Sequence, residues 1–473
     1  MNAPQDSPST LIFKGLRFAN AGRFEQPVDV DHDLDRADTG LYGPQCPQVI
    51  GMMEQMLGQG SLPSDEDCFF LNVFTPGRDS ARRPVMVWVH GGAFTNGTGA
   101  TPWYHGASLV ERYGVVVVTI NYRLGAFGFA HLADHGGDDF RDSGNLGILD
   151  QVSALRWVQR NIASYGGDPD NVTIFGESAG GSSVLSLMAT PAGTGLFHKV
   201  IALSPSMSQL RDRTRAHEAA SELLVAAGAD ARALRHASTE TVLEAQRAVL
   251  RRPGGSFTAF APTPGEPSIP DHVADAAARN PVPLLIGTTK DEMLLFTMLD
   301  PQFQKMDDSG LLAFATARFG ARAADAIDAY RRVRPDSTPG ALASAMATDE
   351  GFRGPARRLA EARVRAGHPT WMHWFTWETP AFGGVLRSCH ALDIPFVFHN
   401  LDRNGVSAFT GDGDDRTALA ETFSGAVTRF ATDGSPGWEP YDLERRTTMR
   451  LDSESATVED PEAELRILWE EPS

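Results

Sequence analysis

The sequence predicts an α/β fold with a mostly parallel central sheet and helices on both of its faces. The first observation is a series of short, almost continuously apolar segments at 84–90, 114–120 and 199–203. Such segments are typical of strands in the middle of a sheet, where both faces are covered. The second observation is that segments with helical periodicity lie between them. This alternation indicates parallel strands joined by crossover helices.

The composition indicates a globular protein with a large core. A chain of 473 residues could form up to three domains, although large α/β proteins often form one. The formal net charge of −18 argues against binding to nucleic acid or to anionic membranes. There is no apolar run of about 20 residues and no export signal, so we expect a cytoplasmic location. Three cysteines exclude a disulfide scaffold.

The elements in the first half of the chain are the easiest to justify. A strand at 71–75 ends at Pro76-Gly77, and the strand at 84–90 ends in a glycine pair. Apolar residues spaced three or four apart predict an amphipathic helix over 146–164, namely Leu149, Val152, Leu155, Val158 and Ile162. This helix leads through a Gly-Gly-Asp-Pro turn into the next strand.

The second half of the chain is richer in helices. We expect helices at 213–252, a strand at 282–286, helices at 310–366, a strand at 370–377, a helix near 416–432 and a polar, acidic tail. No internal repeat or linker is evident. We therefore predict a single domain, 1–473, with helical insertions at about 205–280 and 300–368 that roof the sheet.

The segment Val172–Gly181 carries the strongest chemical signal. A short strand runs into Gly176-Glu177-Ser178-Ala179-Gly180, and a helix-like segment follows. This is the G-x-S-x-G pattern in the strand–turn–helix setting that exposes a serine hydroxyl. Side chains at Gly176 and Gly180 would collide with neighbouring backbone. We predict that Ser178 is a nucleophile, the alternative being a glycine-rich turn with an inert serine.

A serine nucleophile needs a base and an acid that orients the base. His390 is the best candidate for the base because it follows the strand at 370–377. Glu292 or Asp291, after the strand at 282–286, is the candidate acid, and Asp393 is a further one. In open α/β sheets such groups gather at the carboxyl ends of the strands.

The same chemistry needs donors for an oxyanion. His90-Gly91-Gly92-Ala93 supplies small residues at a strand end, and we predict that the backbone N–H groups of Gly92, Ala93 and Ala179 are the donors. The sequence has no H-E-x-x-H motif, no cysteine pair at metal-ligand spacing and no phosphate-binding loop. We therefore expect neither a metal nor a cofactor.

Taken together, the motifs resemble the type-B carboxylesterase family of α/β-hydrolases, which includes bacterial p-nitrobenzyl esterases and the cholinesterases. The resemblance covers nearly the whole chain, through the blocks 43–47, 66–73, 90–94, 121–125, 144–151, 161–181, 283–292 and 389–396. It implies an α/β-hydrolase fold and a catalytic triad of Ser178, Glu292 and His390. It also implies an oxyanion hole of Gly92, Ala93 and Ala179.

The resemblance further implies supporting roles for Ser204 and Glu177, and it makes Asp291 a neighbour of the triad. Cys46 and Cys68 match a family disulfide, although a reducing cytoplasm could keep them reduced. Cys389 resembles a free thiol beside the histidine.

The chain departs from the family pattern at several positions. Ala93 replaces a glycine, Met293 and Pro205 stand where glycines are usual, and the segment 260–265 is altered. None of these changes removes a catalytic atom, but Met293 and Pro205 put the substrate range in doubt. The aromatic residues near the site loops are either pocket residues or ordinary core residues, namely Phe94, Trp103, Phe296 and Phe396.

We therefore predict a serine hydrolase that cleaves carboxylic esters through an acyl-enzyme intermediate. The alternatives are a carbamate or amide hydrolase with the same triad, and a non-catalytic binding protein. The expected partner is a small-molecule ester, with no nucleic acid or membrane, and the chain is expected to be a monomer or homodimer.

Overall fold

The computed structural model describes residues 10–31, 40–51, 55, 62–206, 210–252 and 259–470. Within them, one large sheet has the strand order β1-β4-β6-β5-β7-β8-β9-β10-β11-β12. The strands are β1 (Leu11–Arg17), β4 (Phe70–Thr75), β5 (Arg83–Val89), β6 (Val116–Ile120), β7 (Gly167–Glu177), β8 (Lys199–Leu203), β9 (Leu284–Thr289), β10 (Thr370–Phe375), β11 (Thr447–Leu451) and β12 (Ala456–Glu459). A separate small sheet pairs β2 (Ala19–Asn20) with β3 (Val28–Asp29).

The sheet is parallel from β6 to β11 and antiparallel at its ends. Neighbouring strands run parallel throughout the middle of the sheet, whereas β1 and β4 at one end and β12 at the other run antiparallel to their neighbours. The mostly parallel α/β sheet predicted from the sequence is confirmed.

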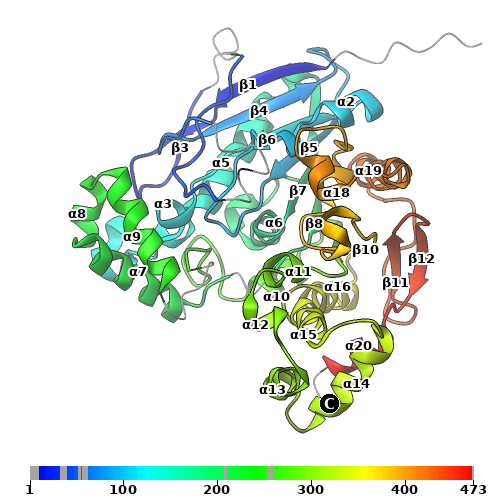
Figure 1. Ribbon diagram of the computed structural model, residues 1–473. Helices are drawn as coiled ribbons and strands as arrows, with labels where there is room; N and C mark the ends of the chain where they lie inside the picture. The colour runs from blue at the N-terminus through cyan, green and yellow to red at the C-terminus, as the bar shows by residue number, and fades with distance from the viewer. Residues whose placement is uncertain are drawn as a thin grey trace, which may run out of the picture.

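Helices surround this sheet (Figure 1). They are α2 (Ala107–Tyr113), α3 (Gly125–Phe129), α4 (Ala133–Gly136), α5 (Leu146–Asn161), α6 (Ala179–Ala189), α7 (Arg213–Ala227), α8 (Ala231–His236), α9 (Thr239–Arg251), α10 (Val273–Arg279), α11 (Leu294–Thr297), α12 (Pro301–Gln304), α13 (Asp308–Phe319), α14 (Ala323–Val333), α15 (Pro339–Thr348), α16 (Gly354–Arg365), α17 (Ile394–Val397), α18 (Val406–Thr410), α19 (Asp415–Asp433) and α20 (Ala463–Leu468). A π-helical turn, η8 (Asp349–Arg353), joins α15 to α16.

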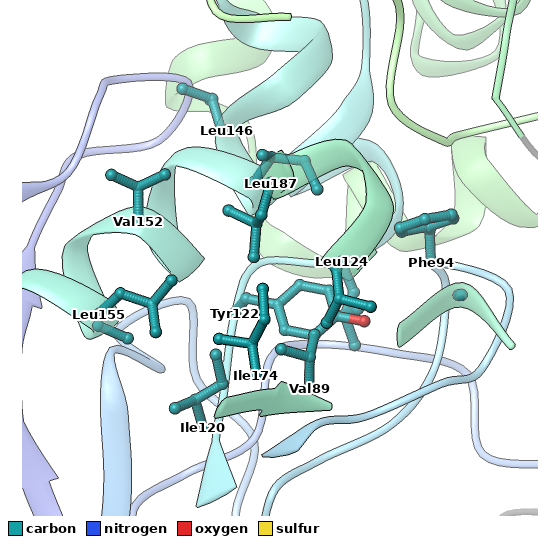
Figure 2. Packing of buried hydrophobic residues seen from close by; sticks show 14 of the residues in the cluster. Val89, Phe94, Ile120, Tyr122, Leu124, Leu146, Val152, Leu155, Ile174 and Leu187 are labelled. Atoms are coloured by element: carbon teal, nitrogen blue, oxygen red, sulfur yellow. The ribbon is translucent and has the colours of Figure 1, made fainter. Parts of the chain in front are cut away.

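Two hydrophobic clusters cover the two faces of the sheet. On one face, strand side chains such as Val89 and Ile174 pack beneath Val152 of α5 and Leu187 of α6 (Figure 2). On the other face, the strands pack against α2, α17 and α19. Burying both faces explains why the central strands carry uninterrupted apolar segments. A third cluster joins α13, α14 and α15 to α20, away from the sheet.

The prediction of a polar tail was incomplete. The C-terminal segment contains β11, β12 and α20, and β11 and β12 extend the parallel sheet at its edge. The side chains of β12 are largely exposed. A polar edge strand is held by backbone hydrogen bonds rather than by apolar burial, so it lacks the hydrophobic pattern that marks a central strand.

Candidate active site

The predicted nucleophile lies at a sharp turn between β7 and α6. Ser178 has φ +57° and ψ −119°, a conformation that costs energy for a residue other than glycine. A Cβ atom at Gly180 would lie 2.0 Å from the carbonyl oxygen of Val89, and one at Gly176 would lie 2.5 Å from the backbone of Gly180. The backbone geometry therefore requires glycine at both positions, as the sequence predicts.

The predicted base and acid meet on loops at the ends of neighbouring strands. Glu292 follows β9 and His390 follows β10. The Nδ1 atom of His390 and the Oε2 atom of Glu292 are joined by a hydrogen bond of 2.5 Å. The backbone N–H of Thr289 donates to the Oε1 atom of Glu292 at 2.8 Å. Both side chains are buried, so this pair has a fixed orientation.

The two rival acids lie elsewhere. The Oδ1 atom of Asp291 accepts a hydrogen bond of 2.8 Å from Arg334. Asp393 is fully buried, and neither of its carboxyl oxygens has a hydrogen-bond partner among the described residues. Burial raises the pKa of Asp393 well above its usual range, and the nearby carboxyl groups add to this effect. Of the three candidate acids, Glu292 is the one that contacts the imidazole.

A second carboxylate approaches the other nitrogen of the imidazole. The Nε2 atom of His390 lies 3.1 Å from the Oε1 atom of Glu177, without the geometry of a hydrogen bond. Burial alone would lower the pKa of His390, but Glu177 and Glu292 together raise it to about 9. Burial raises the pKa of Glu177 to about 7, against the opposing charge of His390. The sequence assigns Glu177 only a supporting role and does not predict this contact.

The hydroxyl group of Ser178 faces the same cavity as the imidazole. Among the described residues, no hydrogen bond joins the Oγ atom of Ser178 to His390, although both side chains line one cavity. In unliganded enzymes the bonds that transfer protons are often long and shorten only when the substrate binds.

The predicted oxyanion donors lie beside Ser178. Gly92 and Ala93 have φ values of +115° and +54°, and a Cβ atom at Gly92 would lie 2.2 Å from the carbonyl oxygen of Asn96. The N–H groups of Gly92 and Ala93 make none of the loop hydrogen bonds of the described residues. Ala179 is the first residue of α6, where a helix has no internal acceptor for its N–H groups. Gly92 and Ala93 thus lie on the loop after β5, which lines the cavity together with Ser178, and Ala179 directly follows Ser178 in the chain.

His90 holds this loop in place. Its ring stacks on Tyr122 with 4.4 Å between the centroids, and the Tyr122 hydroxyl donates to the carbonyl oxygen of His90 at 2.8 Å. Burial lowers the pKa of His90 to about 4, so this histidine is neutral at physiological pH. It is therefore a structural residue rather than a second base.

The cavity above Ser178 has a volume of about 670 Å³. Its lining is largely aromatic and aliphatic, and it includes Trp103, Tyr104, Met293, Leu295, Phe296, Phe303, Ile394 and Phe409. Of the aromatic residues considered from the sequence, Trp103 and Phe296 line the cavity. Phe94 and Phe396 belong to the two sheet cores instead. Phe94 follows β5 on the loop that carries Gly92, and Phe396 lies in α17, but a sequence does not show that their rings turn into the cores.

The remaining predicted residues are buried around the site. Ser204 has φ +45°, and its hydroxyl has no hydrogen-bond partner among the described residues. Cys46, Cys68 and Cys389 are buried free thiols. The Sγ atom of Cys46 accepts a hydrogen bond from the backbone N–H of Leu124 at 3.2 Å.

Comparison with known proteins places this geometry in a family. The model of the carboxylesterase family matches residues 2–467. The chain belongs to the carboxylesterase family. It is 37% identical to the para-nitrobenzyl esterase of Bacillus subtilis (strain 168), over 96% of this chain and 94% of that protein. It is 33% identical to the phenmedipham hydrolase of Pseudarthrobacter oxydans, over 81% of this chain and 77% of that protein.

Solved structures of the carboxylesterase family share the whole fold. The crystal structure of Geobacillus stearothermophilus carboxylesterase EST55 at pH 6.2 matches with a TM-score of 0.85 and 34% identity, over 99% of this chain and 97% of that one. The predicted α/β-hydrolase fold and carboxylesterase family are thus confirmed. The chain is a serine hydrolase of carboxylic esters, and the comparisons do not favour either alternative function.

The part of the chain that the structure describes shows neither a membrane-spanning helix nor a cluster of metal ligands. No helix within it is both long enough and apolar enough to cross a membrane. No group of three or more histidine, cysteine, aspartate or glutamate side chains within it is arranged to hold a metal ion.

Proposed function

We propose that Ser178, His390 and Glu292 are the nucleophile, base and acid of this carboxylesterase. The observation that carries the proposal is their arrangement at one cavity. Ser178 and His390 line it together, and the Nδ1–H group of His390 donates a hydrogen bond to Glu292, which holds that side of the imidazole. This leaves Nε2 as the ring nitrogen that can take a proton from the serine hydroxyl.

The reaction proceeds in two steps through an acyl-enzyme. Ser178 attacks the carbonyl carbon of the ester while Nε2 of His390 accepts the hydroxyl proton. The negative charge that develops on the carbonyl oxygen is stabilised by the N–H groups of Gly92, Ala93 and Ala179. His390 then gives the proton to the departing alcohol. In the second step, His390 takes a proton from water, which attacks the acyl-enzyme and releases the carboxylic acid.

Glu292 stabilises the imidazolium that forms in both steps. Its carboxylate accepts the Nδ1 proton, which fixes the tautomer with a free Nε2. The base must be neutral before each attack, so the raised pKa of His390 limits the reaction at low pH. This property follows from the carboxylate on each side of the ring.

The shape and chemistry of the cavity suggest the substrate class. A volume of about 670 Å³ lined by Trp103, Phe296 and Phe409 suits esters with an aromatic or a medium-sized aliphatic group. The similarity to the para-nitrobenzyl esterase of Bacillus subtilis supports aromatic esters as a first choice.

The decisive test is turnover by Ser178→Ala. We expect a fall in kcat of roughly 10⁴–10⁶-fold on p-nitrophenyl acetate and butyrate, with an unchanged fold by circular dichroism. Ser182→Ala is a matched control, because Ser182 lies one turn further along α6 and donates to the backbone oxygen of Ser206 instead of facing the cavity. Near-normal turnover by Ser178→Ala would overturn the assignment.

We also propose that the chain forms one domain with helical insertions at about 205–280 and 300–368. The direct pairing of β9 with β10 supports this, because helices α11 to α16 lie between these strands in the sequence. The cytoplasmic location, the absence of nucleic-acid binding and the monomeric or dimeric state stay predictions.

A further inference from the structure

A second cavity lies away from Ser178, between helix α16 and strands β10 and β11. It encloses about 30 Å³, which is room for about two water molecules or one small anion. Three arginines line it: Arg353 and Arg357 from η8 and α16, and Arg446 from the segment before β11. Thr288, Tyr441 and Thr448 add hydroxyl groups to the lining.

Arg357 lacks a hydrogen bond although it is mostly buried. Its side chain is 13% exposed, and it makes no hydrogen bond to any other described residue. Its nearest carboxylate is that of Glu361, which is 3.8 Å from its Nε atom. A guanidinium has five N–H donors, and buried donors without acceptors are costly.

The nearby carboxylates do not satisfy these donors. Glu361 lies 3.8 Å from Arg357, 3.5 Å from Arg446 and 3.4 Å from Arg365, and its buried Oε1 atom accepts no hydrogen bond from any described residue. Asp460, the carboxylate that lines the cavity, is bound by Arg466 at 2.9 Å. Arg446 Nε and the hydroxyl of Tyr441 are also buried without partners among the described residues. The cavity therefore presents unmatched donors, and three arginines line it against the one lining carboxylate, that of Asp460.

The surroundings of Arg357 disfavour its charge. Burial and the neighbouring charge of Arg353 lower the pKa of Arg357, and Glu361 and Asp349 compensate only in part. Arg353 is better satisfied, because it pairs with Glu462, donates to the carbonyl oxygen of Pro461 at 2.6 Å and stacks over Trp374. Arg357 and Arg446 are thus the two cations with donors to spare.

We propose that Arg357, Arg446 and Tyr441 bind a small monoanion, a halide or a short carboxylate, in this cavity. A carboxylate would be recognised by the fork of the guanidinium, and a halide by several N–H and O–H donors at once. The small volume favours a halide or a short carboxylate over a larger organic anion. Ester hydrolysis itself releases carboxylates, so a short-chain product has the right chemistry.

The cavity is coupled to the active site through η8. Arg353 is the last residue of this π-helical turn, and the ring of the preceding Phe352 lies 5.1 Å from the ring of His390. The carbonyl oxygen of Gly351 accepts a hydrogen bond from Ser206 at 3.1 Å. Single π-helical turns often occur at functional sites. An anion that ties Arg357 to Arg446 fixes α16 at its junction with η8, and we expect kcat to respond.

Binding is tested first, without reference to activity. Crystals grown in sodium bromide should show an anomalous peak between Arg357 and Arg446. Titration calorimetry with bromide and with acetate, at constant ionic strength in a bulky sulfonate buffer, should give saturable binding. Tighter binding of bromide would identify the ligand as a halide, and tighter binding of acetate would identify it as a carboxylate. Ordered water alone in the cavity, or heat that does not saturate, would overturn the site.

Matched variants locate the binding. Arg357→Gln should weaken the anion at least about tenfold, because a charged donor is lost. Tyr441→Phe, which keeps every charge and the ring, should weaken it about threefold and covers the case in which Arg357→Gln folds poorly. Arg358→Gln removes the exposed arginine next along α16 and should change nothing. Equal affinity in all four proteins would contradict the proposal.

The coupling is tested by kinetics and rests on the proposed role of His390. Saturating anion should change kcat on p-nitrophenyl butyrate by at least about twofold in the wild type and not in Arg357→Gln. Binding without a change in kcat would overturn the coupling but not the site. Near-normal turnover by Ser178→Ala would instead overturn the proposed catalytic residues and would leave the anion site unaffected.

Discussion

Two buried charge clusters meet at the π-helical turn η8, and they have opposite signs. In the first, three carboxyl groups surround one cation: Glu177 and Glu292 flank His390, and Asp393 lies nearby. In the second, the largely buried Arg357 and Arg446 lie beside the carboxylate of Glu361, which also pairs with the exposed Arg365. Each cluster has one minority charge and a surplus of the other sign, and each leaves a buried group without a hydrogen bond.

The difference lies in how the surplus charge can be relieved. A buried carboxyl group can take up a proton, and the raised pKa of Asp393 shows that burial favours its neutral form. An arginine stays protonated at any physiological pH, so Arg357 cannot become neutral by losing a proton. The acidic cluster adjusts by protonation, whereas the basic cluster requires a ligand. Substitutions that remove a charge from one cluster or the other test this difference.

The largest effect is expected from Glu292→Gln. The amide cannot stabilise the imidazolium and favours the wrong tautomer, so kcat should fall about 10⁴-fold. Asp393→Asn is the matched control, because an amide replaces a carboxyl group whose neutral form is favoured by burial. It should keep kcat within about tenfold of the wild type, because Asp393 does not contact His390. Equal losses in the two variants, measured on p-nitrophenyl butyrate, would show that Glu292 has no special role.

A balanced arginine provides the contrast for the basic cluster. Arg123 is 3% exposed and holds Asp150 through bonds of 2.7 and 2.8 Å, with a further bond of 2.8 Å to the carbonyl oxygen of Glu25. Arg123→Gln leaves a buried carboxylate unpaired and should lower the free energy of unfolding by about 3–5 kcal/mol. Urea denaturation measures this change, and a loss below about 1 kcal/mol would mean that the pair is not buried in solution.

The sequence predicted some parts of the active site and missed others. The turn at Ser178 was predictable because its glycines, its strand and its helix are adjacent in the chain, and local sterics dictate the conformation. Glu292 and His390 were predictable only as polar residues on loops that follow strands of a parallel sheet. The choice of Glu292 over Asp291 came from the family resemblance, since either residue fits the spacing.

The contacts that the sequence missed depend on distant segments. Glu177 and His390 are far apart in the chain, and their 3.1 Å approach arises from the order of the strands. The same holds for Arg357 and Arg446, which look like ordinary surface arginines in the sequence. Strands β11 and β12 were missed because neither has an apolar pattern. Strand β11 buries threonine side chains, and the edge strand β12 is held by backbone hydrogen bonds with its side chains largely exposed. The periodicity of apolar residues indicates which side chains are buried. It does not indicate which charged residues meet or which strands pair at a sheet edge.

A moderate effect is expected when the acidic cluster loses Glu177. Glu177 and Glu292 raise the pKa of His390 to about 9, and a base must be neutral to accept the serine proton. Glu177→Gln removes one anion, so the pKa of His390 falls and the acidic limb of kcat/KM moves to lower pH.

The profile of kcat/KM against pH on p-nitrophenyl acetate measures this shift. Glu378→Gln removes an exposed carboxylate that pairs with Lys290 and should leave the limb in place. A limb that moves to higher pH, or does not move in Glu177→Gln, would contradict the role of Glu177.

The smallest effect is expected from Arg357→Gln on stability. In a buffer without small anions, burial and Arg353 disfavour the charge on Arg357, so its removal should leave the free energy of unfolding within about 1 kcal/mol of the wild type. Adding acetate or bromide should then stabilise the wild type and not the variant, because only the wild type binds the anion in its folded state. A loss as large as that of Arg123→Gln in anion-free buffer would mean that Glu361 already satisfies Arg357. The charge of the basic cluster would then be balanced without a ligand, and its contrast with the acidic cluster would disappear.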